Sequence, residues 1–144
     1  MPEISTTENE ELVARIYNEA MSTLDSGKQI SAPALVVHDV EHLMQEANSA
    51  VSFEGYFRWA SLDEIGRIRE QLRAVGLSRI LELTERAIQV AFPNGIPTTE
   101  EEKRNATEWT PEQEESLASL FGDLEEQNGH VTNVLGEYAR TNGL

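Results

Sequence analysis

The sequence predicts an all-α fold, a single-domain bundle of about six helices over residues 1–144 with no β-sheet. Apolar residues recur every three or four positions along six segments, and no segment alternates with the period of two typical of a strand. Signals for the beginning and the end of helices lie between these segments. A length of 144 residues suits one domain with its own core.

The apolar stripes define the predicted helices in order. The first two, over about residues 8–24 and 32–49, carry Leu12, Ile16, Ala20 and Leu24, and then Leu35, Val36, Val40, Leu43, Met44 and Ala47. The next two carry Ile65, Ile68, Leu72 and Val75, and then Ile80, Leu81, Ala87, Ile88 and Ala91. A helix over about residues 111–127 carries Leu117, Leu120, Phe121 and Leu124, and the last carries Val131, Val134, Leu135 and Tyr138.

Helix boundaries are marked by four stretches with the capping-box pattern. They are Thr7-Glu8-Asn9-Glu10, Ser61-Leu62-Asp63-Glu64, Thr99-Glu100-Glu101-Glu102 and Thr110-Pro111-Glu112-Gln113. Left-handed helix ends are expected at Gly27, Gly76 and Asn128-Gly129. The turn-rich stretch from Phe92 to Pro97 is a connector too short to separate two domains. The aromatic residues Tyr56, Phe57, Trp59 and Trp109 are expected to pack in the core or between helices.

The net charge of −15 is unusual and is unevenly distributed. Residues 1–54 and residues 99–126 each carry ten acids and two bases, whereas the segment between them is close to neutral. Such a balance argues against direct binding to nucleic acid and to anionic membranes, and it favours attraction to basic proteins. A solvated surface that only maintains solubility is the simpler alternative. In the central segment, Arg67 is placed to pair with Asp63 four residues earlier.

The helix over about residues 111–127 carries a stripe of acids opposite its apolar face. The stripe consists of Glu112, Glu115, Ser119, Asp123 and Glu126, with Glu114 and Glu125 at its border. A helix of this length spans about 25 Å, over which one DNA strand places roughly seven phosphates. Its six carboxylates therefore approach the linear charge density of one strand. Because like charges at this spacing repel without local compensation, the stripe suggests a purpose.

Chemical sites are weakly indicated. His38, His42 and Glu46 follow one another at intervals of four on the polar side of a helix. Two histidines at this spacing can bind zinc, but the pattern differs from that of zinc proteases, and no third ligand is specified at a recognisable distance. No cysteine, serine-nucleophile motif, phosphate loop or dinucleotide fingerprint is present. The sequence therefore predicts a protein that is not an enzyme and needs no cofactor or metal. It also shows no membrane span and no signal-peptide pattern, which favours a cytoplasmic location.

One stretch resembles a bacterial family of helical domains known through DNA-mimic proteins. The resemblance, over roughly residues 40–140, rests on residues 46–57, on Gly76 and on the Phe92-Pro93, Gly95, Pro97 and Arg104 pattern. The family shows a Gly-Gly pair where this chain has Val51-Ser52, and a glutamine where it has Gly55. The resemblance implies an all-helical fold and an activity in which carboxylates replace phosphates on the DNA-binding face of a regulator.

The leading hypothesis is therefore a DNA mimic that binds a basic DNA-binding protein, such as a transcriptional regulator. The predicted binding residues are Glu100, Glu101, Glu102, Glu108, Glu112, Glu115, Asp123 and Glu126. Two alternatives remain at this point: a helical module that binds through an apolar groove, with acids serving only solubility, and a metal-dependent enzyme around His38, His42 and Glu46. The sequence leaves open whether the chain forms homo-oligomers and whether the two acid-rich segments share one surface.

Overall fold

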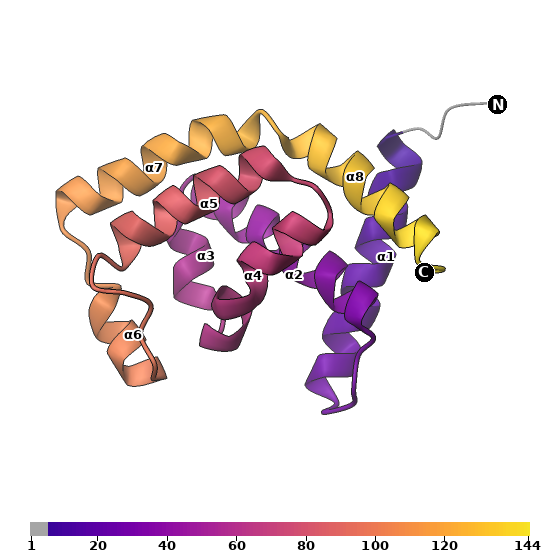
Figure 1. The fold of residues 1–144 in the computed structure, drawn as a ribbon, viewed down its shortest axis with the longest axis horizontal. Coiled ribbons are helices and arrows are strands. Elements are labelled where there is room, and N and C mark those ends of the chain that lie inside the picture. The colour runs from indigo at the N-terminus through magenta and orange to yellow at the C-terminus, as the bar shows by residue number, and fades with distance from the viewer. Residues whose placement is uncertain (1–5) are drawn as a thin grey trace.

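The computed structural model describes residues 6–144, which form eight helices and, within that range, no strand. The helices are α1 (Thr6–Asp25), α2 (Ala32–Ala50), α3 (Glu54–Trp59), α4 (Leu62–Ala74), α5 (Ser78–Ala91), α6 (Glu100–Ala106), α7 (Pro111–Glu125) and α8 (Asn128–Thr141) (Figure 1). The all-α prediction is confirmed, but the predicted number of about six is too low. The two unpredicted helices, α3 and α6, have six and seven residues, too few to repeat an apolar pattern.

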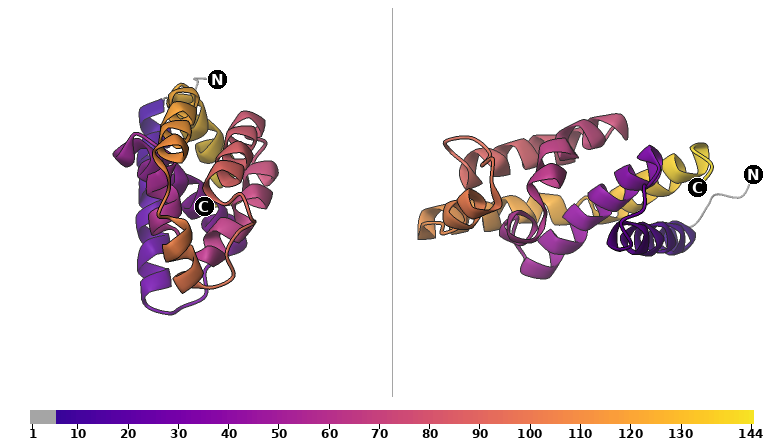
Figure 2. Two further views of the ribbon diagram at one scale, coloured as in Figure 1. Left: turned by 90° about the vertical axis from the view of Figure 1, so that its left-hand side faces the viewer. Right: turned by 90° about the horizontal axis from the view of Figure 1, so that it is seen from below.

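The helices form an elongated molecule with α6 near one end and α1 near the other (Figures 1 and 2). α7 and α8 follow each other as an arch along one side, and α5 packs against α7. α1 packs on α8 and α2, and α2 also contacts α3, α4 and α7. The first helices of the two acid-rich segments in the described chain, α1 and α6, therefore lie at opposite ends of the fold.

The core collects the predicted apolar stripes around the aromatic residues at the beginning of α3 and directly before it. Phe53, Tyr56 and Phe57 are fully buried, together with aliphatic side chains from α2, α4, α5 and α7. One prediction is wrong here, because Trp59 exposes 73% of its surface. Trp59 is the last residue of a helix of fewer than two turns, and Tyr56 and Phe57 already fill the buried face.

The connection from α2 to α3 depends on a strained residue and a close approach. Val51 follows α2 with a φ of 55°, in the left-handed region, and the next amide, of Ser52, donates to Ala47 O at 3.1 Å. A Cβ added at Gly55 would lie 2.5 Å from Glu46 O, so α3 can approach α2 closely only with glycine at this position. The tight connection brings Phe53 directly into the core.

The predicted helix boundaries are partly correct. Thr110 and Gln113 form the reciprocal capping box, and Ser61 and Thr99 each accept a hydrogen bond from the amide three residues later. Gly27 and Gly76 have the expected positive φ.

Two predicted boundaries are wrong. α1 already includes Thr6, so Thr7 is not its N-cap. Asn128-Gly129 begins α8 and does not end a helix in the left-handed conformation, because α7 and α8 are joined by only two residues that keep right-handed φ angles. Among the helices of residues 6–144, none is both long enough and apolar enough to cross a membrane.

Candidate functional site

Seven of the eight predicted binding residues lie on α6, on α7 or on the turn between them, and Glu126 directly follows α7; we call these eight acids the acidic surface. All eight side chains are exposed. The acidic surface therefore faces solvent, as the helical periodicity predicted for its members on and directly after α7.

The position of α7 is fixed at its beginning by side chains that contact the end of α5. Pro111 occupies the first turn after the Thr110 cap. The Gln113 side chain accepts a hydrogen bond from the Thr110 amide and donates one to Val90 O at 2.9 Å. Trp109 donates from its indole nitrogen to Ala91 O at 3.1 Å. These contacts anchor α7 to α5, so its outward acids sit on a rigid helix.

Three members of the acidic surface have contacts within the chain. Asp123 forms an ion pair with Arg79 of α5 at 3.1 Å. Glu100 accepts a hydrogen bond from the Leu62 amide, and Glu102 accepts one from the Thr98 amide. The other five make no ion pair or hydrogen bond with any part of the chain between residues 6 and 144; they are Glu101, Glu108, Glu112, Glu115 and Glu126.

A groove with a volume of about 730 Å³ lies between α5 and α7. Val90 and Leu120 are its only apolar lining residues. Its remaining lining is polar or charged, and includes Glu112 and Glu115 of the acidic surface beside Arg86. The groove thus adjoins the acidic surface, and only two of its eight lining residues are apolar, fewer than a groove that binds an amphipathic helix usually has.

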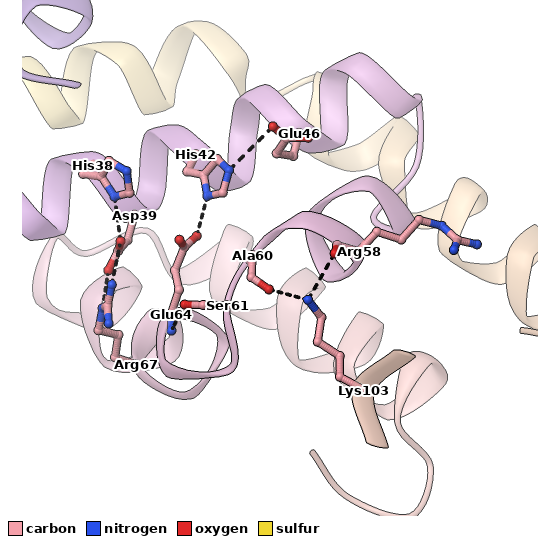
Figure 3. A network of polar contacts seen from close by, with 10 residues as sticks. All are labelled: His38, Asp39, His42, Glu46, Arg58, Ala60, Ser61, Glu64, Arg67 and Lys103. Atoms are coloured by element: carbon pink, nitrogen blue, oxygen red, sulfur yellow. Dashed lines mark hydrogen bonds and ion pairs between the residues drawn. The ribbon is translucent and has the colours of Figure 1, made fainter. Parts of the chain in front are cut away.

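The sequence places the histidines of α2 on the polar side of that helix. In the structure they belong to a largely buried polar network between α2 and α4 (Figure 3). Asp39 is fully buried; His38 donates to it at 2.9 Å, and Arg67 of α4 binds it through Nε at 2.6 Å and through a second nitrogen at 3.2 Å. The predicted pair of Arg67 with Asp63 is therefore wrong. The buried carboxylate attracts the guanidinium more strongly than an exposed carboxylate does, because water screens it less.

The second half of the network centres on His42, which lies between two carboxylates (Figure 3). Its Nδ1 is 2.7 Å from Glu64 of α4, and its Nε2 is 3.6 Å from Glu46. Burial by itself would lower the pKa of His42, but the hydrogen bond and charge of Glu64 prevail and raise it. Glu64, which the sequence assigned to a capping box, thus contacts the imidazole instead.

The network on α2 and α4 also sets the charge state of Asp39. Burial favours the neutral acid, but hydrogen bonds from His38 and Arg67 outweigh this and lower the pKa of Asp39. The carboxylate is therefore ionised and paired with the guanidinium across the helix interface. Together the two pairs tie α2 to α4 through charged groups shielded from water.

A metal site is the third possibility that the sequence raised, with His38, His42 and Glu46 as its residues. The structure brings a different set of possible ligands together. Ligand atoms of His38, Asp39 and Glu64 lie within 4.8 Å of one another. Arg67, however, already binds both oxygens of Asp39, and His42 holds Glu64. A cation at this place would have to displace a guanidinium, so these donor atoms suit an internal ion-pair network better than a metal site. Sequence reasoning missed Glu64 and Arg67 because their partners lie more than twenty residues away.

Comparison with known proteins gives one result. A family model described as DMP19-like protein matches residues 28–142, which include the whole of α2 to α8 and every member of the acidic surface. The match confirms the family resemblance found in the sequence. No curated protein and no solved structure shows a significant match to the chain.

Proposed function

The chain belongs to the DMP19-like protein family, whose name refers to DNA mimic protein 19, and from this premise we propose that it is a DNA mimic that binds a basic DNA-binding protein. The carboxylates of the acidic surface take the places of phosphates in front of the lysines and arginines that otherwise contact DNA. In this proposal the protein acts by binding and has no catalytic role. A transcriptional regulator or a nucleoid protein has the required cationic face.

The observation that carries the proposal is that five exposed carboxylates of the acidic surface have no cationic partner in residues 6–144. An unpaired carboxylate on a rigid helix is available to an incoming lysine or arginine without first breaking an internal ion pair. The repulsion between neighbouring acids costs a few tenths of a kcal/mol for each pair in the free protein, and a cationic partner relieves it. Binding to a basic protein is thus favoured, because it relieves a repulsion that these acids have in the free protein.

The density of charge along α7 also supports the proposal. The helix has 15 residues, which corresponds to about 22 Å, and one DNA strand places six or seven phosphates over roughly that distance. α7 and the residue after it carry six carboxylates and neither lysine nor arginine. The acids form two groups of three, at residues 112–115 and 123–126, separated by about 12 Å of uncharged helix. Two clusters of phosphate-binding cations on one DNA-binding protein would match this arrangement.

The test is capture of DNA-binding proteins by the immobilised chain from a lysate of its own cells, followed by elution with duplex DNA. We expect proteins that DNA displaces, and an affinity that falls when salt rises from about 50 to about 200 mM. Changing four unpartnered acids to glutamine should weaken the binding of such a protein at least tenfold. The four are Glu101, Glu108, Glu112 and Glu115.

A matched control removes the same charge from other exposed positions that also lack a partner in the described chain. These positions are Glu10, Glu11, Glu85 and Glu137. If only the overall charge of −15 mattered, both fourfold variants would bind equally weakly, and the assignment of the acidic surface would be wrong. If captured proteins resist elution by DNA, mimicry itself is wrong.

A further inference from the structure

Trp59 is the most exposed large hydrophobic residue in the described part of the chain, with 73% of its surface accessible. It ends α3 next to α6, whose first residues contribute to the acidic surface. A pocket of about 410 Å³ lies between these two helices, lined by Arg58, Trp59, Glu100, Lys103, Arg104 and Thr107. Glu100 therefore belongs both to the acidic surface and to this pocket, which we call the Trp59 pocket.

The Trp59 pocket is held rigidly by contacts between α3 and α6. Lys103 is buried, and its ammonium donates to Arg58 O at 3.1 Å and to Ala60 O at 2.5 Å, on either side of Trp59 (Figure 3). The Arg58 guanidinium lies 4.9 Å from the centre of the Trp109 ring. The backbone that carries Trp59 is thus fixed before any ligand arrives, which reduces the entropy lost on binding.

The charge of the pocket is opposite to that of the protein as a whole. Three of its six lining residues are cationic and one is acidic, whereas the chain carries −15. The guanidinium of Arg104 makes no ion pair or hydrogen bond with residues 6–144, and the ion pair of Arg58 with Glu54, at 3.9 Å, is a long one. A cation without an internal partner beside an exposed indole is complementary to an acidic group next to an apolar side chain.

We propose that the Trp59 pocket receives an apolar side chain flanked by a carboxylate on the DNA-binding protein that the acidic surface engages. Trp59 is the apolar anchor of that interface, and Arg104 pairs with the carboxylate. This inference rests on the proposed function and adds selectivity to it. Duplex DNA repels an acid at this position whereas the pocket attracts it, so the chain discriminates among basic proteins that all bind DNA.

Substitution of Arg104 separates this inference from general electrostatics, because the two predict opposite signs. If the interface is only an acidic chain facing a basic protein, Arg104→Glu strengthens binding, because replacing a positive by a negative side chain lowers the net charge by two units. If Arg104 meets a carboxylate, the same substitution weakens binding. Arg69→Glu is the matched control, since Arg69 is an exposed arginine of α4 that also lacks a side-chain partner in the described chain.

The measurement is the dissociation constant of each variant for a protein that the wild-type chain captures and DNA displaces. We expect Trp59→Ala to weaken binding at least tenfold with an unchanged salt dependence, Arg104→Glu to weaken it about fivefold or more, and Arg69→Glu to leave it within about twofold. Thermal unfolding of each variant confirms that its fold is intact.

The outcomes distinguish the two proposals. If the fourfold glutamine variant of the acidic surface loses binding while Arg104→Glu binds more tightly and Trp59→Ala is unaffected, the pocket inference is wrong and mimicry stands. If that fourfold variant binds normally while Trp59→Ala and Arg104→Glu lose binding, the pocket is the interface and mimicry is wrong. If no captured protein is displaced by DNA, the pocket inference loses its premise and is rejected together with mimicry.

Discussion

Val51 offers a direct test of how the chain turns from α2 into α3. It is a β-branched residue at a φ of 55°, a region that favours glycine and asparagine, and the family resemblance places a glycine pair at this point. The left-handed turn is retained because it delivers Phe53 into the core and brings Gly55 against the backbone of α2. Replacing Val51 by glycine should relieve the strain while keeping the turn.

The expected gain follows from three contributions. Left-handed strain costs roughly 1–3 kcal/mol, and the upper half of that range applies to a β-branched side chain. Against this relief, glycine adds about 0.5–1 kcal/mol of unfolded-state entropy. Val51 is 62% exposed, so losing its side chain forfeits only about 0.5 kcal/mol of burial. The net result is a stabilisation of about 1 kcal/mol, or an increase of roughly 2–4 °C in the midpoint of thermal unfolding.

The assay is urea unfolding followed by circular dichroism at 222 nm, together with a thermal scan. Ser49→Gly is the control, because Ser49 is exposed in the last turn of α2 and has an ordinary helical conformation. Glycine there should destabilise the protein by about 0.5 kcal/mol. If Val51→Gly is destabilising to the same extent, the left-handed turn is not the source of strain and the reasoning fails.

Three further experiments test the packing of α8 on α1 and the buried polar network of α2 and α4. Gly136→Ala should destabilise by roughly 1–3 kcal/mol in urea unfolding, because the added Cβ would lie 2.2 Å from the side-chain oxygen of Asn9 between α8 and α1. The stability contributed by His42 should be complete below its unfolded pKa of about 6.5 and should disappear as pH rises through its raised folded pKa. Unfolding free energies measured at several pH values should therefore fall over this range. Glu64→Gln should make the fall smaller. Arg67→Ala should cost about 3 kcal/mol in unfolding free energy, because it leaves a fully buried carboxylate without its cation.

Each of these predictions has a control on the same helix or in the same experiment. Gly129→Ala adds a Cβ that meets nothing within 4 Å and should be neutral or slightly stabilising. Arg69→Ala removes an exposed arginine from α4 and should change stability by less than about 0.5 kcal/mol. NMR titration of the His42 imidazole checks the pKa directly, and a value below the ordinary one would refute the role assigned to Glu64.

Local signals predicted most of the fold, and they failed where local and distant interactions competed. The long helices were found because each repeats its apolar pattern over several turns, and Thr110 capped α7 as expected because its box involves only neighbouring residues. Glu64 also sits in a capping pattern, but His42 lies within 2.7 Å of its carboxylate and binds it instead. Sequence alone does not reveal which group a carboxylate binds when one of its possible partners is distant in sequence and comes close only on folding.

The same distinction between local and distant interactions applies to the candidate site. Exposure of the α7 acids follows from the helical period of Leu117, Phe121 and Leu124 on the opposite face, so it could be predicted. The pairing of Asp123 with Arg79 depends on how α5 packs on α7 and could not. The Trp59 pocket could not be predicted for the same reason. It forms between a short helix and a segment more than forty residues away, which a buried lysine holds together.

The two acid-rich segments are not equivalent, and the difference points to α6 and α7 as the site of any shared family activity. The N-terminal segment includes Asp39, which is buried and paired with Arg67, so its charge is partly used inside the fold. Its outward acids on α1 lie at the far end of the molecule from α6, and α1 itself falls outside the region that the family model matches. We therefore expect an activity common to the family to reside in residues 28–142, where α6 and α7 hold the densest group of exposed carboxylates without partners in the described chain. For this reason charge removed from α1 and charge removed from α7 should have unequal effects on binding, although both change the net charge by the same amount.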